Sequence, residues 1–162
     1  DEMAGDFHLE ITGIEGESKV KGFEGKIQIE SWNWGVTNSG SSHHGGGAGA
    51  GKSNPQDFSF AMYQSKASPE LMSHCALGKH IPEVIFTSRK AGGEQLKSFE
   101  LVMKEVLVSS YQVGGSSHED QHLESISFNF ASLMMKYKEQ NKDGTLGGNV
   151  DKGYDWKAVD EL

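Results

Sequence analysis

This sequence has few cysteines and prolines and no long apolar run. Its 162 residues include one cysteine, Cys75, and three prolines. A single cysteine cannot form a disulfide within the chain, so folding does not require an oxidising compartment. No apolar run is long enough to cross a membrane as a helix. The acidic start at Asp1 and Glu2, followed by strand-like sequence, does not resemble a signal peptide.

Basic residues are also few, because 15 lysines and arginines stand against 23 aspartates and glutamates. The formal net charge of −8 repels nucleic acids and anionic lipids. We therefore expect no nucleic-acid partner and no membrane insertion. The expected location is the cytoplasm, and export would use a route that does not read a classical signal peptide.

The chain is rich in glycine, with 21 residues, and its apolar and polar side chains alternate over several segments. This two-residue period is typical of half-buried strands. It covers residues 6–12, 26–36, 58–62, 83–89, 96–108 and 123–137. We predict one domain over residues 1–138, which includes a projecting glycine-rich loop at 38–54, and a partly flexible C-terminal tail at 139–162.

One helix is predicted over residues 68–77. Ser68 is placed to cap its N-terminus, Pro69 suits its first turn, and Gly78 suits a left-handed C-terminal end. The face that would pack onto a sheet is formed by Leu71, Met72, Cys75 and Ala76. On that face the cysteine is expected to act as a small hydrophobic residue rather than as a nucleophile.

Two strand segments change their apolar side part-way. In residues 26–36 the apolar positions move from odd to even numbers, and in residues 123–137 they move from even to odd. A slip of one residue turns every side chain to the other face, so we expect a bulge or a transfer between sheets near residues 30–31. Two such strands favour a mainly β fold, namely a small closed or strongly coiled barrel of two sheets with one flanking α-helix.

Residues 46–53, GGAGAGKS, match the P-loop pattern that binds nucleotide phosphates. A P-loop also needs a helix that begins at its lysine. After Lys52 the chain passes Pro55, and residues 56–62 have the period of a strand instead. A flexible loop is therefore favoured over a nucleotide site.

Residues 118–122, HEDQH, match the HExxH pattern of zinc proteases. That chemistry needs a long helix and a third ligand. Here the motif follows a run of glycine and serine and leads directly into a strand, which favours a solvated turn. We predict no catalytic residues, no cofactor and no structural metal. Adventitious metal binding stays open at His43, His44, His118 and His122.

A series of short motifs resembles the haemolysin-coregulated protein (Hcp) family of bacterial type VI secretion systems. In the order of that family, the motifs are GES (16–18), SWNWG (31–35), NSGS (38–41) leading into residues 45–52, QDFSF (56–60), KASP (66–69), GKH (78–80), RKAGG (89–93), VLVSS (106–110) and NF (129–130). They extend over residues 7–137 and are far more specific than the two short enzyme motifs. The sequence departs from the family pattern at its histidine-containing loops and in the tail.

The resemblance implies a structural protein rather than an enzyme. It implies six-membered rings that stack into a hollow tube, which is exported inside a contractile sheath behind a spike and carries effector proteins in its lumen. Its partners would be further copies of itself, the sheath, the spike and effectors. The alternative is a secreted β-barrel that binds a ligand or effector without forming tubes.

Two sets of site residues follow from this interpretation. The predicted contact loop between rings or subunits consists of Gly45, Gly46, Gly47, Ala48, Gly49, Ala50, Gly51 and Lys52. Asn33 is the candidate for the lumen, because it lies between Trp32 and Trp34 and must point to the opposite side of their strand. Ordinary exposed sheet surface is the other possibility for Asn33.

Overall fold

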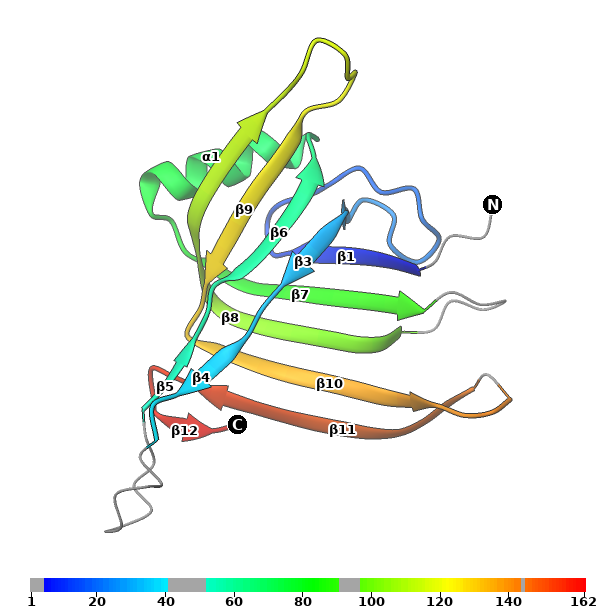
Figure 1. The fold of residues 1–162 in the computed structure, drawn as a ribbon, viewed down its shortest axis with the longest axis vertical. Coiled ribbons are helices and arrows are strands. Elements are labelled where there is room, and N and C mark those ends of the chain that lie inside the picture. The colour runs from blue at the N-terminus through cyan, green and yellow to red at the C-terminus, as the bar shows by residue number, and fades with distance from the viewer. Residues whose placement is uncertain (1–4, 41–51, 91–96, 144) are drawn as a thin grey trace.

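The computed structural model describes residues 5–40, 52–90, 97–143 and 145–162. This part of the chain is mainly β (Figure 1). Its elements are β1 (Gly5–Ile11), β2 (Ile27–Ile29), β3 (Ser31–Asn33), β4 (Val36–Asn38), β5 (Ser53–Pro55), β6 (Phe58–Tyr63), α1 (Ala67–Leu77), β7 (Ile81–Lys90), β8 (Lys97–Gly114), β9 (Leu123–Asn129), β10 (Ser132–Gln140), β11 (Leu146–Asp155) and β12 (Asp160–Glu161). Among the described residues there is no helix long and apolar enough to span a membrane.

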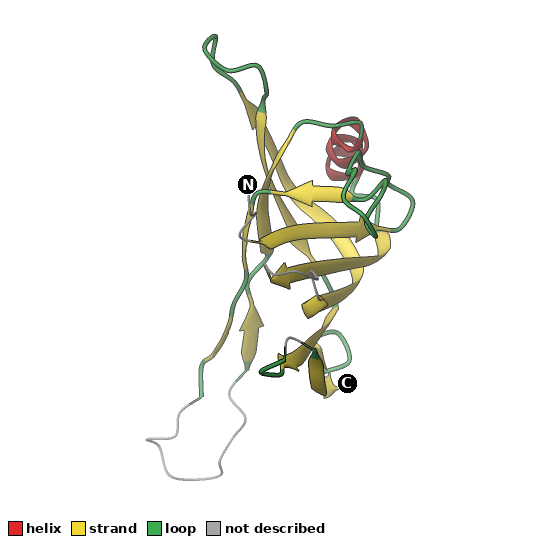
Figure 2. Ribbon diagram, turned by 90° about the vertical axis from the view of Figure 1, so that its right-hand side faces the viewer, coloured by secondary structure: helices red, strands yellow, loops and turns green. Residues whose placement is uncertain are grey.

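Two antiparallel sheets share the long strand β8. Sheet A has the order β12-β11-β10-β8-β7-β1-β2, and its part of β8 pairs with β7 and β10. Sheet B has the order β8-β9-β6-β3, and its part of β8 begins at residue 107. Figure 2 shows the strands of the two sheets crossing at a steep angle. The apolar faces of both sheets enclose the core.

Glu105 marks the point where β8 passes from sheet A to sheet B. Its φ of 51° lies in the left-handed region, which is uncommon for a residue with a side chain. Lys104 still pairs with β7 and β10, whereas Leu107 already pairs with β9. A backbone kink of this kind re-aims a strand, which lets one strand serve two sheets.

The predicted changes of side correspond to changes of sheet. The chain leaves sheet A after β2 and enters sheet B with β3, and Glu30 between them donates its N–H to Ala61 in β6. The segment 123–137 likewise divides into β9 in sheet B and β10 in sheet A. The prediction of a sheet transfer near residues 30–31 is therefore confirmed.

The prediction of a mainly β fold of two sheets with one flanking helix is confirmed, but the described residues form no closed barrel. Strand β2 pairs only with β1, and β3 pairs only with β6. The chain connects these two strands covalently at Glu30, but no ladder of hydrogen bonds joins them. Each sheet therefore keeps open edges, and the molecule is a two-sheet structure linked through β8 with α1 beside it.

The core is dense in aromatic rings. Phe58 lies between two neighbouring rings, tilted against Phe86 at a centroid distance of 5.3 Å and stacked on Phe128 at 6.5 Å. Trp32 of β3 lies 4.5 Å from Phe86 and 5.8 Å from Phe99, so β3 packs over the middle of sheet A. Aromatic pairs at these distances stabilise the packing beyond the area that they bury.

The helix α1 forms as predicted but begins one residue earlier and uses different contacts. Gly78 ends it with φ 64° and ψ 29°, as expected. The prediction that Ser68 caps the helix is wrong, because the N-cap residue is Lys66. The Lys66 backbone N–H donates a hydrogen bond to Glu17 Oε2 at 3.0 Å. Leu71 is buried and Cys75 is half-buried against the core, whereas Met72 and Ala76 are exposed, so half of the predicted packing face was wrong.

A buried carboxylate explains why Ser68 is not free to cap the helix. Glu124 of β9 is fully buried and accepts a hydrogen bond from Ser68 Oγ at 2.8 Å and another from the Tyr111 hydroxyl. The three side chains attach α1 to sheet B. Burial and the bond to Glu124 raise the pKa of Tyr111 to about 12, because both favour the protonated phenol.

The C-terminal residues extend sheet A. Strand β11 pairs with β10 along its length, and the ring of Trp156 lies 6.0 Å from Phe130 and 5.2 Å from Tyr154. Trp156 Nε1 also donates to Ser53 Oγ at 3.0 Å. The end of the chain is thereby attached to the base of the β4–β5 hairpin. The division at residue 138 into a domain and a partly flexible tail stays a prediction.

Candidate functional site

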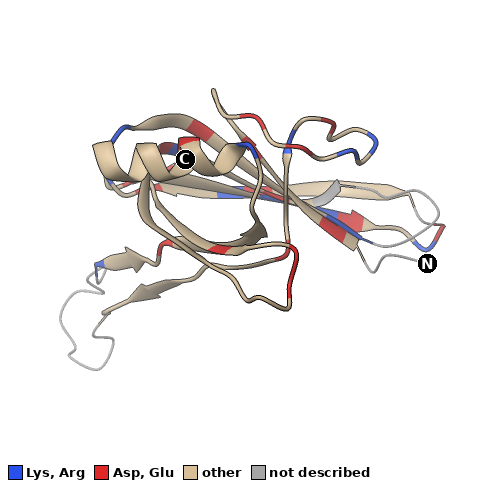
Figure 3. Cartoon of the chain, turned by 90° about the horizontal axis from the view of Figure 1, so that it is seen from above, with Lys and Arg blue, Asp and Glu red and all other residues tan. Residues whose placement is uncertain are grey.

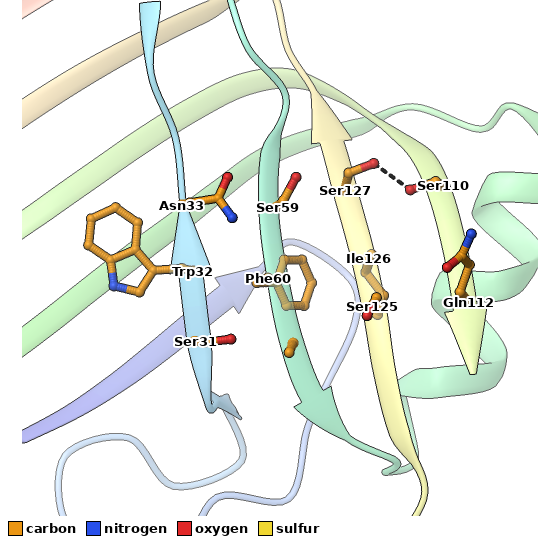
Figure 4. A pocket seen from close by; sticks show the side chains of 11 residues that line it. Ser31, Trp32, Asn33, Ser59, Phe60, Ser110, Gln112, Ser125, Ile126 and Ser127 are labelled. Carbon is orange, nitrogen blue, oxygen red and sulfur yellow. Dashed lines mark hydrogen bonds between the residues drawn. The ribbon is translucent and has the colours of Figure 1, made fainter. Parts of the chain in front are cut away.

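The candidate site is the outer face of sheet B. Along β6 and β9, large apolar side chains turn into the core and alternate with small polar ones that turn outward (Figure 4). We call the outward set the serine face; its members are Ser31, Asn33, Ser59, Ala61, Ser110, Gln112, Ser125 and Ser127. They surround a depression of about 320 Å³.

The strand register brings the serine face together from four separate segments. Ser31 pairs with Ala61, and Ala61 pairs with Ser125. The row continues to Gln112 in β8. A parallel row of Asn33, Ser59, Ser127 and Ser110 lies beside it. Side chains from four separate segments of the sequence therefore form one neutral surface, which is polar except at Ala61.

This surface carries almost no charge. No member of the serine face is ionisable, and Glu124, the one acidic residue in β3, β6, β9 and residues 106–114, points into the core. Figure 3 shows that the basic and acidic residues lie mainly on sheet A and on the connecting loops. Neutral hydroxyls and amides bind through hydrogen bonds that do not depend on the charge of a partner.

A hydrogen-bond network lies at one end of the serine face. Ser127 Oγ is 2.5 Å from Ser110 Oγ and 2.8 Å from Ser109 Oγ. Ser109 Oγ donates to Asp57 Oδ2 at 2.6 Å, and Asn129 Nδ2 donates to Asp57 Oδ1 at 3.2 Å. At the other end, Tyr63 and Leu123 form a directly paired, exposed apolar couple. The two ends of the face are therefore chemically different.

Asn33, the predicted lumen residue, is a member of this face. It is exposed, and it points away from Trp32, as the strand period requires (Figure 4). The serines that surround it were not among the predicted site residues. The signal for them was present, because Ser59 lies between buried Phe58 and Phe60 in β6 and Ser127 lies between buried Ile126 and Phe128 in β9.

The predicted contact loop is only partly described. Lys52 is exposed, and its carbonyl accepts hydrogen bonds from the Ser39 N–H and the Ser39 hydroxyl, each at 3.3 Å. Strands β4 and β5 pair with each other and project away from the two sheets (Figure 1). Gly45, Gly46, Gly47, Ala48, Gly49, Ala50 and Gly51, together with His43 and His44, lie outside the described residues.

The two enzyme motifs do not have the local structure that their chemistry needs. The residues after Lys52 form β5 and β6, so no helix N-terminus faces a bound phosphate there. The HExxH segment 118–122 is a turn between β8 and β9, where Glu119 N–H binds the carbonyl of Ser116 at 3.1 Å. Over the described ranges, no three His, Cys, Asp or Glu side chains gather as metal ligands.

Comparison with known proteins identifies the family. The sequence profile described as "Type VI secretion system effector, Hcp" matches residues 8–137. The protein named "Protein hcp1" of Pseudomonas aeruginosa is 46% identical over 155 residues, which is 95% of each chain. The chain belongs to the Hcp family of type VI secretion proteins.

Solved Hcp structures share the fold described above. The crystal structure of Hcp1 from Salmonella typhimurium has a TM-score of 0.83 and 31% sequence identity, over 99% of this chain and 100% of that chain. A type VI secretion system effector from Yersinia pestis has a TM-score of 0.75 and 34% identity, over 93% and 99% of the two chains. The Hcp family is a structural component of the secretion system, and no catalytic family is indicated for this chain.

Proposed function

We propose that this Hcp chain is a tube subunit, with six copies forming a ring whose lumen is lined by the serine face. The observation that carries the proposal is the state of sheet B: its outward face is neutral and polar, and its two edges are unlike. Within the described residues, β3 pairs only with β6, and residues 107–114 of β8 pair only with β9. Unlike edges join head to tail, and such contacts close into a ring when the rotation permits.

Stacked rings would form the exported tube. The β4–β5 hairpin supports this step, because it projects from one end of the molecule. Residues 45–52, which lie between its two strands in the sequence, would contact the next ring. Small residues allow close backbone approach at such a contact. The sheath would surround the tube, the spike would sit at its tip, and effectors would travel in the lumen. The subunit would be cytoplasmic before the sheath contracts, and it would then be secreted without a signal peptide.

A labelling experiment tests which face lines the lumen. Asn33→Cys is made in a Cys75→Ser background and labelled with a small maleimide-gold cluster, and the rings are viewed end-on by electron microscopy. Gold is expected inside the annulus. Asn149→Cys is the matched control, since Asn149 is exposed on the outer face of β11 and its gold is expected outside the annulus. Gold outside the annulus at both positions would contradict the proposal.

A further inference from the structure

Sheet A extends beyond the area that sheet B covers. On the core-side face of β10 and β11, Met135 pairs with Lys152, and Tyr137 pairs with Val150. The apolar members of this group are exposed by 37%, 42% and 61% for Met135, Tyr137 and Val150. They continue the face of buried Leu101, which pairs directly with Met135. We call these three apolar residues the overhang.

The helix α1 exposes the second apolar surface. Its inner side contacts the core through Leu71, whereas Leu77 is 74% exposed and lies on the same side of the helix as Glu70, seven residues earlier. One side of this helix is already packed on the core. Covering the large apolar side chains that remain in water with a second surface is favourable, because it removes apolar area from water.

These two surfaces lie on opposite sides of the subunit. Trp32 packs on Phe99, so the β3 edge of sheet B lies over sheet A and the overhang continues beyond it. The helix is attached behind the other edge of sheet B by the hydrogen bonds that join Ser68 and Tyr111 to Glu124. Figure 1 shows α1 at the β8 side and the far ends of β10 and β11 at the β3 side.

We propose that the overhang of one subunit covers α1 of the next subunit in the ring. This inference rests on the proposed ring. When the β3 edge of one copy meets residues 107–114 of the next copy, α1 of that next copy comes to lie in front of the overhang of the first copy. Leu77 then packs against Met135, Tyr137 and Val150.

The charges near the two surfaces agree with this contact. Lys152 lies on the same face as Met135, and Glu70 is exposed in the first turn of α1. Opposite charges at the rim of an apolar contact favour one orientation over another. Because each subunit supplies one overhang and one helix, the contact repeats around a ring without leaving either surface in water.

Cross-linking between neighbours tests the contact. Leu77→Cys and Val150→Cys are combined in a Cys75→Ser background and treated with a short bifunctional maleimide. The expected result is a ladder of covalent oligomers up to the hexamer on a denaturing gel. The control pair is Leu77→Cys with Asn149→Cys, since Asn149 neighbours Val150 but points to the opposite face of β11. This control is expected to give monomer.

A second variant measures the energetic role of the contact. Leu77→Glu is expected to raise the concentration at which rings dissociate by about tenfold or more. Rings that form normally, with no selective cross-link and no effect of Leu77→Glu, would overturn this contact and leave the tube proposal standing. A wild-type chain that remains monomeric would overturn the ring itself, together with the contact.

Discussion

His8 is the centre of a buried polar cluster that joins the loop after β1 to sheet A. Its Nε2 is 2.9 Å from Ser18 Oγ, its ring stacks on Phe23 at 4.4 Å, and its Nδ1 lies 3.3 Å from Asp6 Oδ1 without making a hydrogen bond. Arg89 binds Asp6 through two nitrogens, at 2.9 and 2.6 Å. The cluster holds a neutral histidine beside a paired carboxylate.

Burial lowers the pKa of His8, and Arg89 and Lys26 act in the same direction, whereas Asp6 opposes them. The folded protein therefore resists protonation that the unfolded chain accepts at pH values below about 6.5. The stability that this neutral ring contributes is present above that pH and is lost progressively as the pH falls below it.

Replacing His8 should therefore make the free energy of unfolding less dependent on pH. His8→Phe keeps an aromatic ring against Phe23 and removes the titration, at a cost of about 1 kcal/mol for the lost Ser18 bond. Denaturant unfolding near neutral pH and at mildly acidic pH should show a smaller loss for the variant than for the wild type. Equal slopes in the two proteins would show that His8 does not titrate as described.

At the scale of the elements, the bend in β8 is what allows one strand to join two sheets. Glu105 holds a left-handed backbone conformation there, and its carboxylate pairs with Lys157 at 3.2 Å on the surface. An exposed pair of this kind contributes little to stability, so the backbone conformation is the main constraint on the residue at this position.

Glycine should be favoured over alanine at position 105. In an ordinary strand, glycine is less stable than alanine by about 0.5–1 kcal/mol, but a left-handed conformation reverses the preference. Glu105→Gly is expected to unfold at a higher temperature than Glu105→Ala, with a free-energy difference of about 1 kcal/mol. Both variants lose the same ion pair, so their comparison isolates the backbone. A less stable glycine variant would disprove the strain.

Strand periodicity was sufficient to predict β1, β6, β7 and the change of side at Glu30, because a one-residue slip reverses which side chains are buried. It did not predict β11 and β12, which lie in the predicted tail. It was not sufficient to predict closure, since β2 and β3 have the same alternation whether or not a ladder joins them. The role of Ser68 was also out of reach, because its partner Glu124 is 56 residues away in the sequence. Alternation indicated that Ser59 and Ser127 point outward, but not that they join Asn33 in one face, because register determines which separate strands adjoin.

At the scale of the whole molecule, the asymmetry of sheet B is the central feature. One edge is the short strand β3, the other is part of β8 with α1 behind it, and the face between them is neutral. Open edges and exposed apolar residues are an aggregation hazard for a monomer. The proposed ring would cover both edges and both apolar surfaces in every subunit, which would give these features a common explanation.

The solution mass tests this account most directly. Light scattering during size exclusion, repeated over a range of concentrations, should give about 106 kDa, which is six times the 17.7 kDa mass of the chain. End-on electron microscopy of the same fraction should show annular particles. A mass that stays near 17.7 kDa at every concentration would contradict the ring, and the neutral face would then belong to a binding module that works as a single subunit.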